Sequence, residues 1–245
     1  MNAIWLILAA LALAGGDEAP AEPSTPATPA TPTTPTGRGC GRTAFAGLRA
    51  LEVLTGGAAA GDDVPLHVFL HGRGTASAES VASLVRSISV PSRTLVLEGP
   101  VRLPSGGHAW TVARCADADQ TTLANQTRWT ADVLQRALAE IAACYGRKPV
   151  LSGFSNGAML AYAIGARNLP DVAGVVAFAG CLPLELWAAM RGVVGVHGRT
   201  DAVVPFAPTE AMAGATGVDF RPVDGGHDST AGVAAWRAAV EGLLA

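Results

Sequence analysis

From about residue 41 to the C-terminus, short apolar runs alternate with longer segments of helical pattern. The runs are rich in Val, Leu and Phe, whereas the longer segments have helical spacing or composition. This alternation indicates an α/β fold with a mostly parallel central sheet and helices on both faces. The predicted strands are residues 48–54, 66–70, 94–98, 149–153, 174–179, 193–197 and 219–223, and the predicted helices are residues 78–89, 128–145, 156–167, 185–191, 209–215 and 229–244.

The first 39 residues have a different character. Residues 4–14 are apolar but shorter than the ~20 residues that span a bilayer, and they end in the A-x-A pattern of a cleavage site. We interpret residues 1–14 as a signal peptide, with an uncleaved N-terminal anchor as the alternative. Residues 15–39 have proline at every third position from Pro20 to Pro35, which is typical of a polyproline II spacer. We therefore expect export (periplasmic, secreted or envelope-tethered), with residues 40–245 forming the folded domain.

The composition restricts the classes of function that the chain can have. The chain is 49% hydrophobic and 15% charged, with a formal net charge of -3, so it can build a core and has no basic stripe for nucleic acid. Its four cysteines suit two disulfides in an exported chain, with three connectivities open. They lack C-x-x-C spacing and an accompanying metal motif, so we expect no metal and no cofactor.

One short motif suggests nucleophilic chemistry. Ser155 is the central residue of GFSNG, which lies between a predicted buried strand and a predicted helix. This strand–turn–helix context is the one that a G-x-S-x-G nucleophile requires, and the glycines would permit the sharp turn. A serine hydroxyl is a weak nucleophile, so it needs a histidine base oriented by a carboxylate.

Two later loops offer these partners in the order that this arrangement uses. Asp201 follows one predicted strand, and His227 lies in a Gly-rich loop after another. His197 is the rival base, but only three residues separate it from Asp201, so we interpret it as structural. Ser155, Asp201 and His227 are therefore the predicted catalytic residues.

The tetrahedral intermediate also needs donors for its oxyanion. One predicted donor is the backbone N–H of Asn156, which follows the serine at a helix N-terminus. The other is expected from the strand-to-helix loop His71-Gly72-Arg73-Gly74, where glycines let backbone amides face a ligand.

In this order and spacing, FLHGRG, GFSNGA, HGRTDAVVP and GGH resemble the carboxylesterase/phospholipase-type serine esterases of the α/β-hydrolase superfamily, which include acyl-protein thioesterases. The resemblance covers about residue 66 to the C-terminus. It implies Ser155, Asp201 and His227 as the triad and the amides of Arg73 and Asn156 as the oxyanion hole. It also implies that Trp110 walls the substrate cleft.

Two departures from the family pattern concern the motif: Asn156 stands where Gln is usual, and Ala158 where Gly is usual. Both keep the backbone donor. Residues 155–201 leave little room for a cap domain, so we expect an open cleft bordered by residues 103–110 and by Leu182 and its neighbours.

The expected topology also predicts which cysteines lie close to one another. Cys115 and Cys181 follow strands on the catalytic side, whereas Cys144 ends a helix on the opposite side and Cys40 precedes the first strand. A helix continuing from Cys115 to Cys144 would hold these two too far apart for a bond. We predict Cys115–Cys181 and Cys40–Cys144.

The expected function is that of an exported serine hydrolase acting on a small-molecule ester or thioester through an acyl-serine intermediate. A depolymerase or serine peptidase on the same fold is one alternative. A catalytically inactive, envelope-tethered binding protein is another. The sequence leaves the acyl preference, the leaving group and the oligomeric state open.

Overall fold

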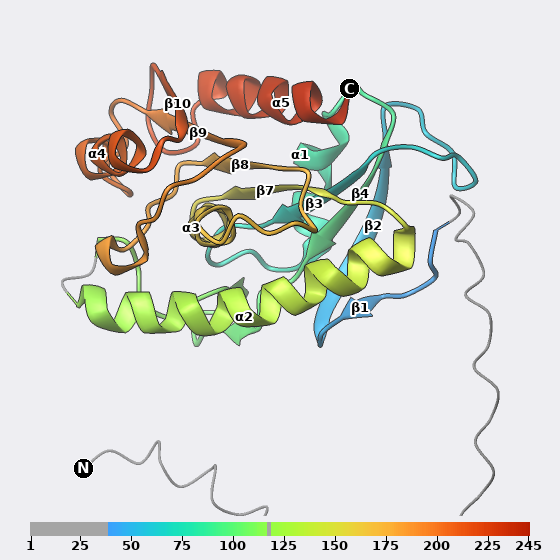
Figure 1. The fold of residues 1–245 in the computed structure, drawn as a ribbon, viewed down its shortest axis with the longest axis horizontal. Coiled ribbons are helices and arrows are strands. Elements are labelled where there is room, and N and C mark those ends of the chain that lie inside the picture. Colours follow the sequence, from blue (N-terminus) through green and yellow to red (C-terminus); the bar gives the residue numbers. More distant parts are fainter. Residues whose placement is uncertain (1–38, 117–118) are drawn as a thin grey trace, which may run out of the picture. The chain divides into compact units, whose positions relative to one another are not determined.

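The computed structural model describes residues 39–116 and 119–245. The predicted signal peptide and the predicted linker up to residue 38 lie outside this part of the chain. The described residues form an eight-stranded sheet in the order β1-β2-β4-β3-β7-β8-β9-β10 (Figure 1). Its strands are β1 (Ala44–Phe45), β2 (Leu48–Thr55), β3 (Leu66–Leu70), β4 (Ser92–Leu97), β7 (Val150–Phe154), β8 (Gly174–Phe178), β9 (Val193–Gly198) and β10 (Asp219–Val223).

The strands from β4 to β10 in this order are parallel, whereas β2 runs antiparallel to β4 and β1 antiparallel to β2. The predicted mostly parallel α/β fold is therefore confirmed. Parallel strands place their C-terminal ends at one edge of the sheet, and the loops that leave this edge are where a site is expected.

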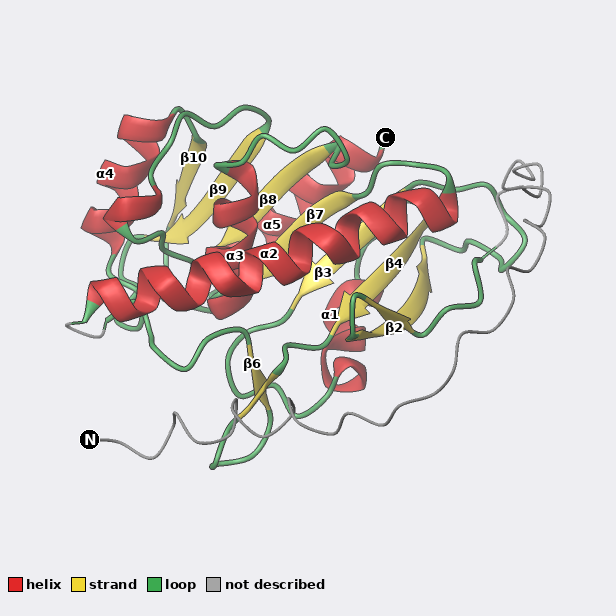
Figure 2. Cartoon of the chain, turned by 60° about the horizontal axis from the view of Figure 1, so that its bottom comes forward, coloured by secondary structure: helices red, strands yellow, loops and turns green. Residues whose placement is uncertain are grey.

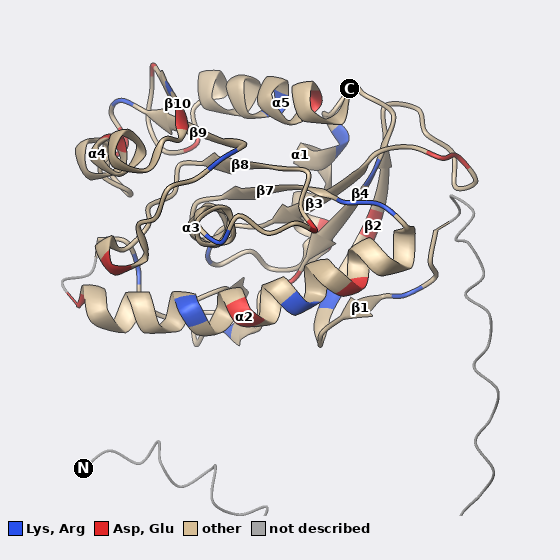
Figure 3. Cartoon of the chain, viewed as in Figure 1, with Lys and Arg blue, Asp and Glu red and all other residues tan. Residues whose placement is uncertain are grey.

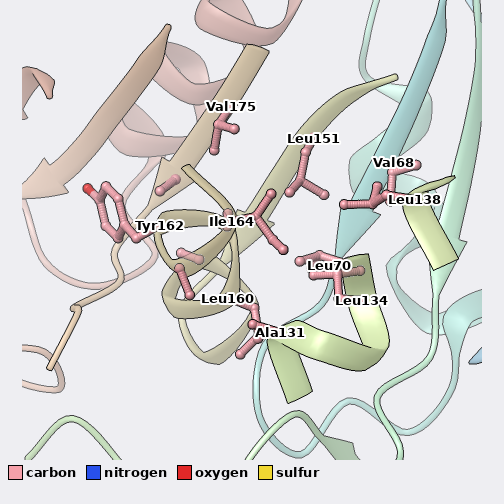
Figure 4. Close-up of a cluster of buried hydrophobic side chains, with 14 of the residues drawn as sticks. Val68, Leu70, Ala131, Leu134, Leu138, Leu151, Leu160, Tyr162, Ile164 and Val175 are labelled. Carbon is pink, nitrogen blue, oxygen red and sulfur yellow. The ribbon is translucent and has the colours of Figure 1, made fainter. Parts of the chain in front are cut away.

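Helices cover both faces of the sheet. On one face lie α2 (Gln120–Tyr145) and α3 (Asn156–Gly165), and on the other lie α1 (Ala82–Arg86) and α5 (Thr230–Leu244) (Figure 1). Within β3, Val68 and Leu70 join the first core and Phe69 joins the second, as the alternation of side chains in a strand requires. Figure 4 shows the first core, where α2 and α3 side chains meet those of the central strands. Both faces being covered explains why the strands read as continuous apolar runs.

The remaining elements are small or lie near the sheet edge. The helix α4 (Phe206–Thr216) precedes β10, and the 3-10 turns η1 (Ala78–Val81) and η2 (Leu184–Leu186) lie in connections. The strands β5 (Val101–Arg102) and β6 (His108–Ala109) form a separate hairpin (Figure 2).

Several predicted boundaries were wrong. The helix predicted at 128–145 begins eight residues earlier, at Gln120, because Asp119 accepts a hydrogen bond from the Thr122 N–H and caps it. The helix predicted at 185–191 is only η2, since Trp187 has extended backbone angles. The segment predicted as one helix at 78–89 is divided between η1 and α1.

Two disulfides join distant segments of the described chain. Cys40 is bonded to Cys144 with their Cα atoms 5.7 Å apart, and Cys115 to Cys181 with theirs 6.1 Å apart. This is the predicted pairing. The first bond attaches the segment before β1 to the end of α2.

Charged residues of both signs are interspersed along the described elements (Figure 3). None of the helices in the part of the chain that the structure describes is both long and apolar enough to cross a membrane.

Candidate active site

Three predicted residues meet at the C-terminal edge of the sheet. Ser155 follows β7 directly, while Asp201 lies in the loop after β9 and His227 in the loop after β10. The Ser155 hydroxyl is 2.9 Å from Nε2 of His227, and Nδ1 of the same ring is 2.7 Å from a carboxylate oxygen of Asp201. The sheet thus brings a serine hydroxyl, an imidazole and a carboxylate into one continuous hydrogen-bonded chain, which is the arrangement of a catalytic triad.

Ser155 has an unusual backbone conformation, with φ of 54° and ψ of -114°. Its N–H donates to the Phe178 carbonyl of the neighbouring strand at 2.9 Å. Such angles are costly for a residue with a side chain and are maintained only when the surroundings fix them. The turn therefore falls on the serine itself.

The glycines of the motif serve close packing rather than the turn. A Cβ on Gly157 would lie 2.2 Å from the carbonyl oxygen of Leu70, and one on Gly153 would lie 2.4 Å from that of Gly157. Only glycine lets the start of α3 approach the strands this closely. This differs from the role predicted for these glycines.

Asp201 is buried and well supplied with donors. One of its oxygens accepts hydrogen bonds from the N–H groups of Val203 and Val204, each at 2.8 Å, while the other faces His227. These bonds fix the orientation of the carboxylate toward the imidazole.

His197 is the second ring near Asp201, with Nε2 3.3 Å from the same carboxylate oxygen that His227 contacts. Nε2 donates to the Val204 carbonyl at 2.9 Å, and within the described residues Nδ1 has no hydrogen-bond partner. Burial lowers the pKa of His197 below its ordinary value. The ring is completely buried and lies outside the pocket that Ser155 lines.

The two residues predicted to supply oxyanion donors line the same pocket as Ser155. Within the described part of the chain, the backbone N–H groups of Arg73 and Asn156 have no hydrogen-bond acceptor. The peptide before Arg73 is held firmly, since the Gly72 carbonyl accepts from His71 Nδ1 at 2.7 Å and from the Thr75 hydroxyl at 2.9 Å. Because the C=O and N–H of a trans peptide point in opposite directions, these bonds also fix the Arg73 N–H.

His71 is neutral in this arrangement. The Gly99 N–H donates to its Nε2 at 2.9 Å, so the ring proton is on Nδ1. Burial lowers the pKa of His71, in agreement with a neutral ring.

The pocket beside Ser155 has a volume of about 700 Å³. Arg73 and Arg114 contribute its basic lining, and the ring of Phe154 lies 5.1 Å from that of His227. Its apolar wall consists of residues that were not predicted as substrate contacts: Phe69, Val81, Leu84, Phe154, Val203 and Val204. The sequence contained one signal of this wall: Val203 and Val204 lie in the loop just after Asp201, where apolar residues are not needed for a turn.

The predicted substrate contacts of Trp110 and Leu182 were wrong. Trp110 is completely buried, and its indole N–H donates to the His71 carbonyl at 2.9 Å. Leu182 is only 5% exposed and belongs to the same hydrophobic core as side chains of α2 and α3. Neither lines the pocket, and the borders predicted from residues 103–110 and from the segment after Cys181 are formed by other loops. Cys115, which is bonded to Cys181, does line it.

Comparisons with solved structures agree with this architecture. The chain is similar to the esterase PE8, with 24% identity and a TM-score of 0.67 over 80% of this chain and 99% of that one. With the Bacillus cereus carboxylesterase it shares 19% identity and a TM-score of 0.63, over 80% of this chain and 94% of that one. With acyl-protein thioesterase 2 of Zea mays it shares 20% identity and a TM-score of 0.54, over 80% of this chain and 99% of that one. None of the curated proteins compared with the chain matches it significantly.

A family model adds evidence from the sequence itself. The model described as phospholipase/carboxylesterase matches residues 59–216, which include the strand before Arg73, the serine motif and Asp201. The neighbouring structures have the α/β-hydrolase fold and are esterases and a thioesterase. The chain therefore belongs to the phospholipase/carboxylesterase family of α/β-hydrolases and is a hydrolase of the carboxylesterase type.

Proposed function

We propose that this protein is an exported serine hydrolase that cleaves small or medium acyl esters or thioesters through an acyl-Ser155 intermediate. The observation that carries the proposal is the chain of hydrogen bonds from Ser155 through His227 to Asp201, together with the pocket that Ser155 and His227 line. In this proposal Ser155 is the nucleophile, His227 the general base and acid, and Asp201 the orienting carboxylate.

Acylation begins when the Ser155 oxygen attacks the carbonyl carbon of the substrate. Its proton passes to Nε2 of His227, and the imidazolium that forms is stabilised by Asp201 at 2.7 Å. The carbonyl electrons move onto oxygen, where the N–H groups of Arg73 and Asn156 donate to the oxyanion. When the C=O bond re-forms, the bond to the leaving oxygen or sulfur breaks, and the leaving group takes the proton from Nε2.

Deacylation repeats the sequence with water as the nucleophile. Water gives a proton to His227 Nε2 as its oxygen attacks the acyl carbon, and the same amides stabilise the second oxyanion. Collapse releases the carboxylic acid, and the proton returns to the Ser155 oxygen. Water is the only co-reactant that this cycle consumes.

The pocket supports the substrate class. About 700 Å³ is within the range of sites for small molecules, and the apolar wall suits an acyl chain. Between Ser155 and Asp201 the chain forms only α3, β8, η2 and β9, so no cap domain lies in that interval. The neighbours named an esterase, a carboxylesterase and an acyl-protein thioesterase support an oxygen ester or a thioester as substrate.

Export is supported by the two disulfides, because such bonds persist mainly in oxidising compartments. The apolar segment at residues 4–14 and the proline-rich segment after it agree with this location.

The test is labelling by a fluorophosphonate probe, with the parent protein compared with Ser155→Ala. We expect labelling of the parent and none of the variant, together with hydrolysis of p-nitrophenyl esters by the parent only. Labelling that survives Ser155→Ala would assign the nucleophile elsewhere. A parent that neither reacts nor hydrolyses any ester in a chain-length series would favour the inactive binding protein.

A further inference from the structure

The side chain of Asn156 holds a neighbouring loop. Its oxygen accepts from the N–H of Trp110 at 2.7 Å and from that of Thr111 at 3.4 Å, and its nitrogen donates to the Thr111 hydroxyl at 2.9 Å. Asn156 is 8% exposed, so these bonds are made in a setting where an unpaired amide would be costly. We call residues 110–112 the bridging loop.

Arg73 binds the same loop through its backbone carbonyls. Its guanidinium Nη1 donates to the carbonyls of Thr111 and Val112, each at 2.8 Å. The two residues whose backbone amides are the proposed oxyanion donors are far apart in sequence and start from different strands. Their side chains nevertheless meet on three consecutive residues.

The bridging loop is itself anchored. The Trp110 carbonyl accepts from the Thr130 hydroxyl at 2.9 Å, and Gln126 accepts from the Val112 N–H at 2.8 Å, so α2 holds the loop at both ends. The buried Trp110 indole donates to the carbonyl of His71, which precedes Gly72 and Arg73 in the chain. The loop can therefore serve as a fixed reference for both donors.

We propose that the side chains of Arg73 and Asn156 are positioning groups that fix the separation of the two oxyanion donors through the bridging loop. The inference rests on the proposed function. Oxyanion donors act when they lie about 2.7–3.1 Å from the developing charge, and a misplacement of about 1 Å can cost about 100-fold in rate. Two loops held on one shared support maintain that distance better than two loops that move independently.

The first test uses Arg73→Met and Asn156→Ala, which keep both backbone amides and remove the side-chain bonds. We expect each to lower kcat for a p-nitrophenyl ester about 10- to 100-fold, with KM changed less than about threefold. The Ki of a trifluoromethyl ketone, which forms a tetrahedral adduct with the serine, should rise in parallel with the loss of kcat.

The shared loop makes a sharper prediction for the double variant. If both side chains act through one support, removing the second after the first costs little, so the double variant should lose far less than the product of the single losses. Independent, multiplicative losses would overturn the shared support.

Matched controls separate positioning from general damage. Arg86→Met, at the exposed end of α1, and Asn125→Ala, on the exposed surface of α2, should leave kcat within about twofold. Arg73→Lys, which keeps a cationic donor, should recover part of the kcat that Arg73→Met loses. The Tm of every variant is measured so that partial unfolding is recognised.

The outcomes also separate this inference from the proposed function. If the parent is labelled at Ser155 and hydrolyses esters while Arg73→Met and Asn156→Ala keep kcat within about twofold, the positioning role is wrong and the proposed function stands. If the parent is inert toward probe and esters, both fail together. A loss confined to KM would assign these side chains to substrate binding and overturn the positioning role.

Discussion

The protein has two serine–histidine pairs whose serines lie only three positions apart in the chain. At the end of β7, Ser155 lies 2.9 Å from Nε2 of His227. Inside β7, Ser152 lies 2.7 Å from Nε2 of His67, which belongs to the neighbouring strand β3. By the contact alone, the inner pair is as good a nucleophile–base pair as the outer one.

Their surroundings differ in every other respect. Ser152 and His67 are completely buried, and the second ring nitrogen of His67 faces the Thr94 hydroxyl at 3.1 Å instead of a carboxylate. Burial lowers the pKa of His67 to about 3, so this ring stays neutral at ordinary pH. The outer pair has Asp201 on its second nitrogen and a pocket in front of the serine.

The comparison teaches that a serine–histidine hydrogen bond is not by itself a catalytic device. The inner pair satisfies two polar groups inside a sheet, where each would otherwise be costly to bury. In the proposed mechanism the outer pair owes its chemistry to the carboxylate, to two nearby backbone amides that have no partner among the described residues, and to the pocket in front of the serine.

The largest expected effect comes from making the same substitution in both histidines. His227→Gln should lower kcat about 10⁴-fold or more, because the proposed general base is lost while the fold is kept. His67→Gln should leave kcat within about twofold, since His67 does not line the pocket, and should lower the free energy of unfolding by about 1–3 kcal/mol through its impaired buried hydrogen bonds. Ester kinetics and urea unfolding of both variants provide the measurement.

A loss of kcat in a well-folded His67→Gln would contradict the division between the pairs. So would a His227→Gln variant that keeps its rate.

Much of the outer site could be predicted from the sequence because its signals are local. A serine between glycines, placed where an apolar strand gives way to a helix, specifies its own position at the sheet edge. Asp201 and His227 follow later strands, and parallel strands bring such loops together whatever their distance in sequence. The alternation of strands and helices was sufficient for the fold itself.

The rest depends on contacts between segments that have no sequence signal of their own. His67 pairs across the sheet with Thr94, and that register follows from the assembled strands. Trp110 was predicted to wall the cleft, yet its indole N–H finds the His71 carbonyl and the ring enters the core. The loop bonds of the Asn156 side chain likewise become visible only once β7 and the β5–β6 hairpin are placed together.

A smaller effect concerns pH. Between pH of about 3 and 6.5 His67 binds a proton in the unfolded chain and not in the folded protein, so the unfolded state binds more protons and stability falls as the pH is lowered. The contribution of one such group reaches about 1.4 kcal/mol per pH unit. In His67→Gln, the free energy of unfolding should therefore fall less steeply from pH 5.5 to 4.5 than in the parent. Urea unfolding at both values gives the two slopes, and equal slopes would show that His67 is protonated in the folded protein.

The smallest effect tests the backbone of the outer serine. At φ of 54° and ψ of -114°, Ser155 occupies the mirror image of an extended conformation, which glycine adopts readily. Ser155→Gly should relieve about 1–3 kcal/mol of strain and lose about 0.5–1 kcal/mol to the greater freedom of the unfolded chain, for a net gain of about 1 kcal/mol. Ser155→Ala keeps the Cβ and controls for the lost hydroxyl, whereas Ser152→Ala leaves His67 without its partner and should lose about 1–3 kcal/mol. If Ser155→Gly is no more stable than Ser155→Ala in urea unfolding, the outer serine carries no strain, and the two pairs differ only in their neighbours and access.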